Sequence, residues 1–343
     1  MKRHLNTLFV TTEGAYLKKD GQAVVVSIEK ENKLRLPLHN LDGIVCFGNV
    51  MCSPYLMGAC AKAGVSITFL TMYGGFIAAV NGYSPGNVLL RREQYRWADI
   101  PEQTLKLAQH FVAAKIANSR NTILRAARDT ASSEARSTLQ KAAKRIVHNI
   151  DAARRTTNLD SLRGIEGESA NTYFSVFNCM IAPRVEGFEF TGRSRRPPLD
   201  RINALLSFLY SMLTHDARSA CEATGLDAAV GFLHRDRPGR PGLSLDLIEE
   251  FRAFIADRLA LSLINRKQIQ AKDFDITDSG AVLLKEKPRK AVLAAYQKRK
   301  QDTITHPFLE EKTTIGLLVH LQARLLARHL RGDLNDYPPF LWR

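Results

Sequence analysis

Alternation of apolar and polar residues dominates the first 85 positions and predicts short β-strands. Residues 33–38 read Lys-Leu-Arg-Leu-Pro-Leu, which has the two-residue period of a half-buried strand. The Asp20-Gly21 pair lies between two runs of β-forming residues and indicates a hairpin. The strands expected from these patterns cover residues 5–11, 15–17, 23–28, 33–38, 43–47 and 65–70. Residues 1–85 are therefore predicted to form a β-rich domain.

The pattern changes near residue 85, where turn-forming residues replace the strands. One helix is expected before this point, at 54–62, with Ser53 as its cap and Pro54 in its first turn. Breakers of regular structure then gather at Gly74-Gly75, Asn81-Gly82 and Ser84-Pro85-Gly86-Asn87. A chain of 343 residues is longer than one hydrophobic core usually serves, so we place a domain boundary here.

From residue 101 onward the spacing of apolar residues is helical. Two basic helices, 101–127 and 132–155, are expected to pair as a hairpin, and a third helix is expected to begin near Glu166. Later helices are expected at 201–214 (capped by Asp200), 217–224, 244–263, 285–300 and 313–330, with a small β-hairpin over 273–284 and a loosely ordered or docked tail at 336–343. The sequence thus predicts an α+β protein in which an all-helical domain, 101–343, follows the β-rich one.

The linker between these domains, residues 86–100, combines basic and aromatic side chains. It includes the adjacent pair Arg91 and Arg92. A linker of this composition can be a joining segment with solvated charges, or it can contact DNA.

The balance of charge favours a polyanionic partner. Lys and Arg number 49 and Asp and Glu number 34, which gives a net charge of +15. Each cation that meets a phosphate releases counterions, so nucleic acid is one expected partner, although anionic membranes or simple solubility explain such a charge as well. No stretch approaches the roughly 20 apolar residues of a membrane span. Five scattered cysteines without a metal-binding spacing indicate reduced thiols in a cytoplasmic protein.

The strongest candidate for chemistry is the stretch 234–252. His234 opens it, and the Pro- and Gly-rich turn that follows carries Arg235, Arg237 and Arg240, which suit phosphate oxygens. A histidine after the apolar triplet 231–233 can also be a half-buried residue without a ligand.

A helical wheel separates the acids of the helix that follows. Asp246 and Glu249 are three residues apart, about 60° from each other, and lie opposite the apolar side. Their side chains can converge on one point. Glu250 points away from the side of the helix that they share and is expected to be solvated. A hard divalent ion takes oxygen ligands from such carboxylates, and an imidazole ligand favours Mn²⁺ as well as Mg²⁺. The alternative is a solvated run of charge at Glu249-Glu250.

A second acidic position lies upstream. Glu166 stands between Gly164 and Gly167, where the chain is expected to turn into a helix. A carboxylate at a positive helix end is favoured in its ionised form, and the glycines allow backbone or substrate to come close. A plain acid at a helix N-terminus explains the same pattern.

Together these motifs resemble the CRISPR-associated adaptation integrase, the metal-dependent DNA endonuclease that captures new spacers. The resemblance is carried by three blocks, Gly164-Ile165-Glu166-Gly167, Gly231-Phe232-Leu233-His234 and Ser244 to Arg252, and by the segments 86–92 and 203–210. It covers essentially the whole chain and is nearest to the version that accompanies type I systems.

The resemblance implies a β-sandwich-like N-terminal domain for dimerisation and partner contact, and an all-helical catalytic domain. It also implies a homodimer joined to a small ferredoxin-like partner protein. Carried over by motif, Glu166, His234 and Glu249 would be the catalytic ligands of Mg²⁺ or Mn²⁺. Many relatives have Asp at the position of Glu249, and Asp246 matches a neighbouring acid that would orient a ligand or a water.

The hypothesis from the sequence is therefore metal-assisted phosphoryl transfer on double-stranded DNA. The 3′-hydroxyl of a foreign fragment would attack a phosphodiester at the repeat boundary. The expected DNA contacts are Arg91, Arg92, Arg163, Arg235, Arg237, Arg240 and Arg252. Two alternatives are kept: a non-catalytic, basic nucleic-acid-binding scaffold, and a general metal-dependent nuclease.

Overall fold

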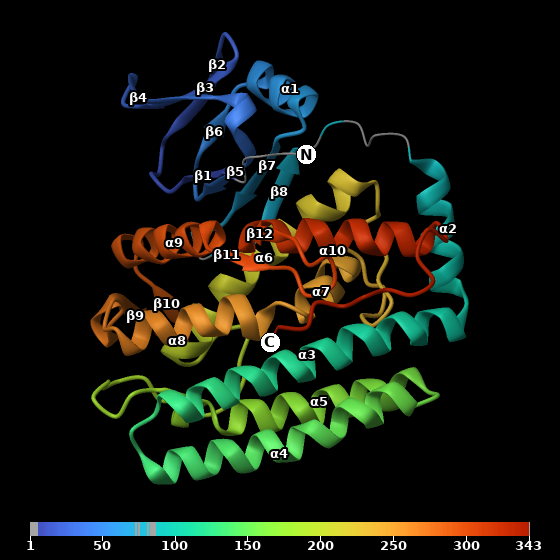
Figure 1. Ribbon diagram of the computed structural model, residues 1–343. Coiled ribbons are helices and arrows are strands. Elements are labelled where there is room, and N and C mark those ends of the chain that lie inside the picture. The colour runs from blue at the N-terminus through green and yellow to red at the C-terminus, as the bar shows by residue number, and fades with distance from the viewer. Residues whose placement is uncertain (1–5, 73, 75, 81, 83–86, 343) are drawn as a thin grey trace. The chain divides into compact units, whose positions relative to one another are not determined.

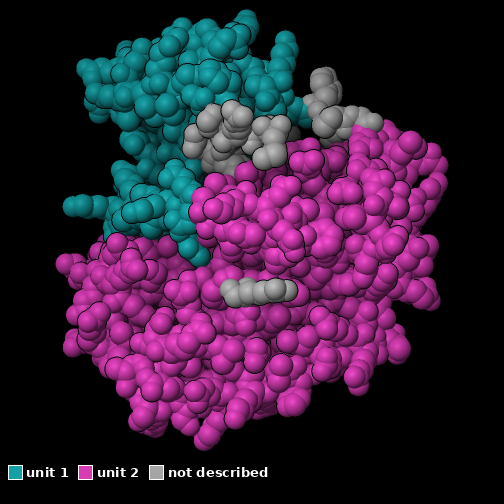
Figure 2. Space-filling view, in the orientation of Figure 1, with its two compact units in different colours: residues 1–86, 286–302 teal, residues 87–285, 303–343 magenta. Residues whose placement is uncertain are grey.

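The computed structural model describes residues 6–72, 74, 76–80, 82 and 87–342. The chain divides into two compact units, residues 1–86 with 286–302 and residues 87–285 with 303–343 (Figure 2). The expected boundary near residue 85, Leu5, and the breakers at Gly75, Asn81 and Ser84–Gly86 lie outside the described residues.

The first unit is built on two four-stranded sheets (Figure 1). One has the order β1 (Asn6–Val10), β5 (Leu41–Phe47), β7 (Ser66–Leu70), β8 (Phe76–Val80), and the other has the order β4 (Glu31–Pro37), β3 (Ala23–Ile28), β2 (Tyr16–Asp20), β6 (Met51–Cys52). Leu17 and Val24 from one sheet share a core with Ile44 and Ile67 from the other. This arrangement confirms the β-sandwich-like N-terminal domain.

Local signals in this unit act as expected. β2 and β3 pair antiparallel, with Asp20 opposite Ala23, and Gly21 adopts the left-handed φ of 58° that the tight turn requires. Helix α1 (Pro54–Ala63) is capped by Ser53, whose Oγ accepts a hydrogen bond from the Leu56 amide at 3.3 Å.

The second unit is mainly helical, and in Figure 1 its helices α3, α4 and α5 run beside one another. Its helices are α2 (Val88–Asp99), α3 (Pro101–Asp129), α4 (Ser133–Arg155), α5 (Leu159–Ser175), α6 (Arg201–Thr224), α7 (Gly242–Glu249), a π-helix (Arg252–Asp257), α8 (Arg258–Asn265) and α10 (Ile315–Leu330). Two small hairpins, β9 (Phe274–Ile276) with β10 (Val282–Leu284) and β11 (Thr303–Thr305) with β12 (Lys312–Thr314), complete it. With the strands of the first unit, this confirms the α+β class.

Several element boundaries differ from those expected. Helix α5 begins at Leu159, because the Asn158 side chain accepts hydrogen bonds from the amides of Asp160 and Ser161. The two helices expected at 201–214 and 217–224 are one helix, α6, since no breaker separates them. The helix expected at 244–263 is interrupted by the π-helical turn.

Two segments fall in other parts of the molecule than the sequence indicated. Residues 88–99, expected as part of a linker, form helix α2, which packs on α3 and α10 in the second unit. Helix α9 (Glu286–Gln301), expected in the helical domain, contacts β1 and belongs to the first unit. Composition alone does not reveal that a helix packs against a sheet 280 or so residues earlier.

The tail is docked. Tyr337 and Phe340 are fully buried, and the Trp342 amide donates to Asn118 Oδ1 at 2.8 Å. Across the helices that the structure describes, we find none with the length and apolar character needed to cross a bilayer. All five cysteines carry free thiols, with Cys46, Cys60 and Cys221 buried.

Candidate functional site

Glu166 lies in the middle of helix α5, eight positions after the cap Asn158. The expectation that it marks a helix N-terminus is therefore wrong, and the helix end does not act on its carboxylate. A Cβ added at Gly164 or Gly167 would meet no atom of the chain within 4 Å. The two glycines leave open space beside Glu166.

The loop that carries His234 is held from one side by Asp246. This carboxylate is fully buried and accepts hydrogen bonds from the amides of Phe232, Leu233 and His234, at 2.5, 3.0 and 3.0 Å. It also contacts His234 Nδ1 at 2.6 Å. Because Nδ1 is engaged, the Nε2 nitrogen is left as the ring atom that can bind a ligand.

The same loop is held from the other side by Arg163 of helix α5. Its Nε and Nη2 atoms both donate to the Leu233 carbonyl, at 3.0 and 2.8 Å, and Nη1 donates to Asp160 at 2.7 Å. Arg163 therefore links the helix that carries Glu166 to the loop that carries His234.

Close backbone contact between this loop and α7 requires two glycines. A Cβ at Gly231 would lie 2.7 Å from the backbone carbon of Gly242 and 2.8 Å from Asp246 Oδ2. A Cβ at Gly242 would lie 2.6 Å from the carbonyl of Ala229. All three distances are too short for a side chain, so the Gly-Phe-Leu-His block packs on the start of α7 through its glycine.

Glu166 and Glu249 come together around one cation, Lys115 of helix α3. The Lys115 ammonium makes an ion pair with Glu166 Oε1, and it lies 2.8 Å from Glu249 Oε2. Glu249 Oε1 pairs with Arg252 Nη1 at 2.7 Å and lies 3.9 Å from His234 Nε2. Helices α3, α5 and α7, the π-helix and one loop therefore meet at this point.

Charge decides the ionisation of Glu249, which is 3% exposed. Burial alone raises the pKa of this carboxyl, but Arg252, Lys115 and His234 outweigh it and bring the pKa down to about 2. Glu249 is thus an anion at neutral pH.

The donor set fits a hard divalent ion in kind: two carboxylates and one imidazole nitrogen. Glu249 Oε2 is buried and lies 2.8 Å from the Lys115 ammonium. Among the residues that the structure describes, no three His, Cys, Asp or Glu side chains form a ready metal cluster. Lys115 and Arg252 neutralise the carboxylates where such a cluster would form.

Glu250, expected to be solvated, is fully buried, so this expectation is wrong. Its carboxyl accepts hydrogen bonds from Tyr337 Oη at 2.5 Å, Gln322 Nε2 at 3.0 Å and the Phe340 amide at 2.7 Å. Burial raises its pKa to about 8 despite these bonds. The wheel describes only one helix, whereas α7 is surrounded by α3, α6 and α10.

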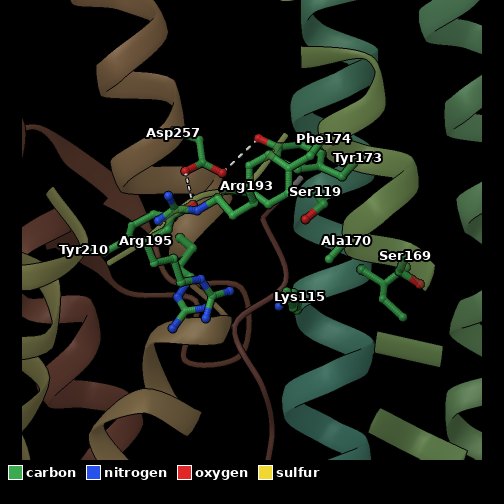
Figure 3. A pocket seen from close by; sticks show the side chains of 13 residues that line it. Lys115, Ser119, Ser169, Ala170, Tyr173, Phe174, Arg193, Arg195, Tyr210 and Asp257 are labelled. Carbon is green, nitrogen blue, oxygen red and sulfur yellow. Dashed lines mark hydrogen bonds between the residues drawn. The ribbon is translucent and has the colours of Figure 1, made fainter. Parts of the chain in front are cut away.

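A pocket beside the carboxylates is lined by Arg252 together with residues that the sequence did not single out, among them Arg193, Tyr210 and Asp257 (Figure 3). Asp257, at the end of the π-helix, accepts hydrogen bonds from Tyr210 at 2.6 Å and Tyr173 at 2.9 Å. Burial raises the pKa of Asp257 to about 6. The guanidinium groups of Arg193 and Arg252 lie over the Tyr210 ring, 5.3 and 5.1 Å from its centroid.

The arginines expected to contact DNA fall into two groups. Arg163, Arg235 and Arg252 have carboxylate partners within the chain, and Arg91 donates to the Gly225 carbonyl at 3.2 Å. Arg92 and Arg237 are exposed, and Arg240 is half-buried. The exposed group is the better placed to meet an external phosphate.

Residues 8–298 match the model of a family described as CRISPR associated protein Cas1. The chain belongs to the Cas1 family. It is 56% identical over 343 residues to CRISPR-associated endonuclease Cas1 1 of Chlorobaculum tepidum, with 100% of both chains covered. It is 52% identical over 348 residues to CRISPR-associated endonuclease Cas1 2 of Rhodospirillum rubrum, again with 100% of both covered.

Solved structures share the fold. A Cas1 protein from Thermotoga maritima has a TM-score of 0.83 at 23% identity, covering 95% of this chain and 97% of that one. A casposase bound to an integration product has a TM-score of 0.84 at 21% identity, covering 99% and 95%. The α+β architecture described above is thus that of known Cas1 proteins.

Proposed function

We propose that this Cas1 family member is a metal-dependent DNA endonuclease and integrase of CRISPR adaptation. Glu166, His234 and Glu249 would hold a divalent ion, Mg²⁺ or Mn²⁺. The observation that carries the proposal is the convergence of Glu166 and Glu249, from separate helices, on one cation position beside His234. Carboxylate oxygens are the ligands that Mg²⁺ and Mn²⁺ take in proteins.

The proposed reaction joins two DNA strands. The 3′-hydroxyl oxygen of a foreign fragment attacks a phosphodiester at the repeat boundary and loses its proton as a new P–O bond forms. The bond from that phosphorus to the 3′-oxygen on its upstream side breaks, and the upstream strand leaves as a 3′-hydroxyl after its oxygen takes up a proton. A bound divalent ion would supply Lewis-acid stabilisation of the charge that develops on the phosphoryl oxygens.

The chain's own residues have separate tasks in this scheme. Asp246 holds His234 Nδ1, so that Nε2 keeps its lone pair toward Glu249. Arg163 and Asp246 fix the backbone of the loop between them. The exposed Arg237 and Arg92 are proposed to contact DNA phosphates and position the strands.

The relatives support this reading. The Chlorobaculum and Rhodospirillum proteins, which match the chain over their full length, are named endonucleases. The casposase of the same fold was solved with an integration product, and another neighbour was solved in a complex named Cas6-RT-Cas1–Cas2. We propose that this chain likewise works as a homodimer, with its β-rich domain in the dimer and partner contacts, on a small ferredoxin-like partner protein in the cytoplasm.

Strand joining in Mn²⁺ tests the proposed site. Glu166→Gln and His234→Ala are each expected to lower the rate of joining by at least about 10²-fold, because each removes a ligand. Circular dichroism should show the fold retained. If either variant joined a labelled 3′-hydroxyl fragment to repeat DNA at the wild-type rate, the site would be misassigned.

The nature of the nucleophile separates the alternatives. Substrates that end in a 3′-deoxy nucleotide should not be joined, while cleavage by water should persist. A scaffold without catalysis would bind DNA equally with and without EDTA and would produce neither product.

A further inference from the structure

Lys115 occupies the point between the two carboxylates proposed as metal ligands. Its ammonium pairs with Glu166 on α5 and with Glu249 on α7, and its side chain is only 14% exposed. A largely buried ammonium between two carboxylates is in the place that a bound cation would take.

Charge in the cluster is balanced without a divalent ion. Glu166 and Glu249 contribute two negative charges, and Lys115 and Arg252 contribute two positive ones. A divalent ion that entered while both cations stayed would meet two like charges at close range. One of the cations must therefore move away.

Lys115 is the cation that can move. Its stem is flexible and its ammonium is a single point charge, whereas the Arg252 guanidinium is held over the Tyr210 ring as well as by Glu249. Lys115 also lines the pocket described above, so its side chain borders open space as well as the two carboxylates (Figure 3).

We infer that Lys115 is a tethered cation that holds the metal position in the metal-free protein and is displaced when a divalent ion binds. It keeps Glu166 and Glu249 close together before the metal arrives, and its ammonium moves away from both carboxylates when the metal binds. This positioning role rests on the proposed function, because it takes Glu166 and Glu249 as the metal ligands.

Calorimetric titration of the metal-free, full-length protein with MnCl₂ tests the exchange. Lys115→Met is expected to lower the Kd for Mn²⁺ by about tenfold, the change that corresponds to about 1.4 kcal/mol, since the metal no longer competes with an ammonium. Lys115→Arg keeps the charge and should stay near the wild-type Kd. Lys106→Met is the matched control, because Lys106 lies on the same helix in a half-exposed ion pair with Asp336.

Thermal unfolding gives a second readout that requires no activity. In EDTA, Lys115→Met should have a lower Tm than wild type, because the buried Glu249 loses a counter-charge, and saturating Mn²⁺ should remove that difference. An unchanged or higher Kd in Lys115→Met, or an unchanged Tm in EDTA, would overturn the inference.

The same titration separates this inference from the proposed function. If Glu166→Gln and His234→Ala weaken Mn²⁺ binding but Lys115→Met does not strengthen it, only the exchange is wrong. If Glu166→Gln and His234→Ala bind Mn²⁺ as wild type does, the metal site itself is misassigned.

Discussion

Arg163 illustrates how a single side chain can serve the site without touching a substrate. The sequence made it a candidate for DNA binding, but all three of its donor groups are used within the chain. Two of them hold the carbonyl that precedes His234. Hydrogen bonds from a charged donor to a buried loop contribute about 1.5–3 kcal/mol each, so their loss should displace the loop.

We therefore predict that Arg163→Ala weakens Mn²⁺ binding by about tenfold, in the range seen when groups that orient metal ligands are removed. DNA affinity should change much less. Arg163→Lys should restore Mn²⁺ binding only in part, because an ammonium cannot reproduce the two parallel hydrogen bonds of the guanidinium group. Calorimetry and fluorescence anisotropy measure the two affinities.

Arg92→Ala is the control, since Arg92 is exposed on α2. The prediction would be contradicted if Arg163→Ala kept wild-type Mn²⁺ affinity but lost as much DNA affinity as Arg92→Ala. Arg163 would then be a phosphate contact.

At the scale of elements, helix α7 joins the site to the C-terminal tail. Glu249 points to the cation cluster, and the next residue, Glu250, binds Tyr337, Gln322 and the Phe340 amide. Asn118 adds a second link, because its amide donates to the carbonyls of Glu250 and Phe340, at 2.7 and 2.8 Å. The tail therefore fixes the helix that carries a proposed metal ligand.

The buried acid in this link predicts how stability changes with pH. The pKa of Glu250 is raised from 4.5 to about 8, so the folded protein binds a proton that the unfolded chain releases above pH 4.5. The contribution of Glu250 is fully present below pH 4.5 and is lost as the pH rises toward 8. Glu249 has the opposite effect, because its pKa is lowered to about 2. Its contribution to stability is present above pH 4.5 and is lost as the pH falls from 4.5 toward 2.

Glu250→Gln should therefore flatten the fall in Tm between pH 5 and pH 8, because an amide has the shape of the protonated acid and does not ionise. At pH 8 the free energy of unfolding of the variant should exceed that of wild type by more than about 1.4 kcal/mol, which is the equivalent of one pKa unit. Differential scanning calorimetry across pH checks this, with the exposed Glu168→Gln as control. Parallel Tm curves for wild type and Glu250→Gln would show that Glu250 is ionised in the folded protein.

At the scale of the whole molecule, the net charge of +15 predicts DNA binding that depends strongly on salt. Each phosphate contact contributes about −0.9 to the slope of log K against log salt concentration on duplex DNA. Arg237, exposed in the turn after His234, is the residue we expect to contribute such a contact.

Arg237→Ala should reduce the slope by about 1 and weaken binding on all duplex sequences alike. Fluorescence anisotropy from about 50 to about 200 mM salt measures this salt dependence of DNA affinity, and EDTA removes any contribution from bound divalent ions. A slope equal to that of wild type would remove Arg237 from the DNA-contacting surface.

Much of this molecule follows from local patterns. Short apolar runs, alternation and the Asp20-Gly21 turn predicted β1 to β5 and β7 but not β6 or β8, and helical spacing predicted α3, α4 and α10. The motif blocks around Glu166, His234 and Glu249 indicated the family, which the matching family model confirms. These features depend on neighbours in sequence, because strand period, turn geometry and capping act over a few residues.

Only the tertiary structure decided which charges meet. Lys115 pairs with Glu166 across 51 positions, and Arg163 reaches the Leu233 carbonyl across 70. On the helical wheel Glu250 points away from the side that Asp246 and Glu249 share. It is nevertheless buried, because other helices and the tail pack around it. The energy of an ionisable group depends on its surroundings in space, and a one-helix pattern contains no information about elements packed from elsewhere in the chain.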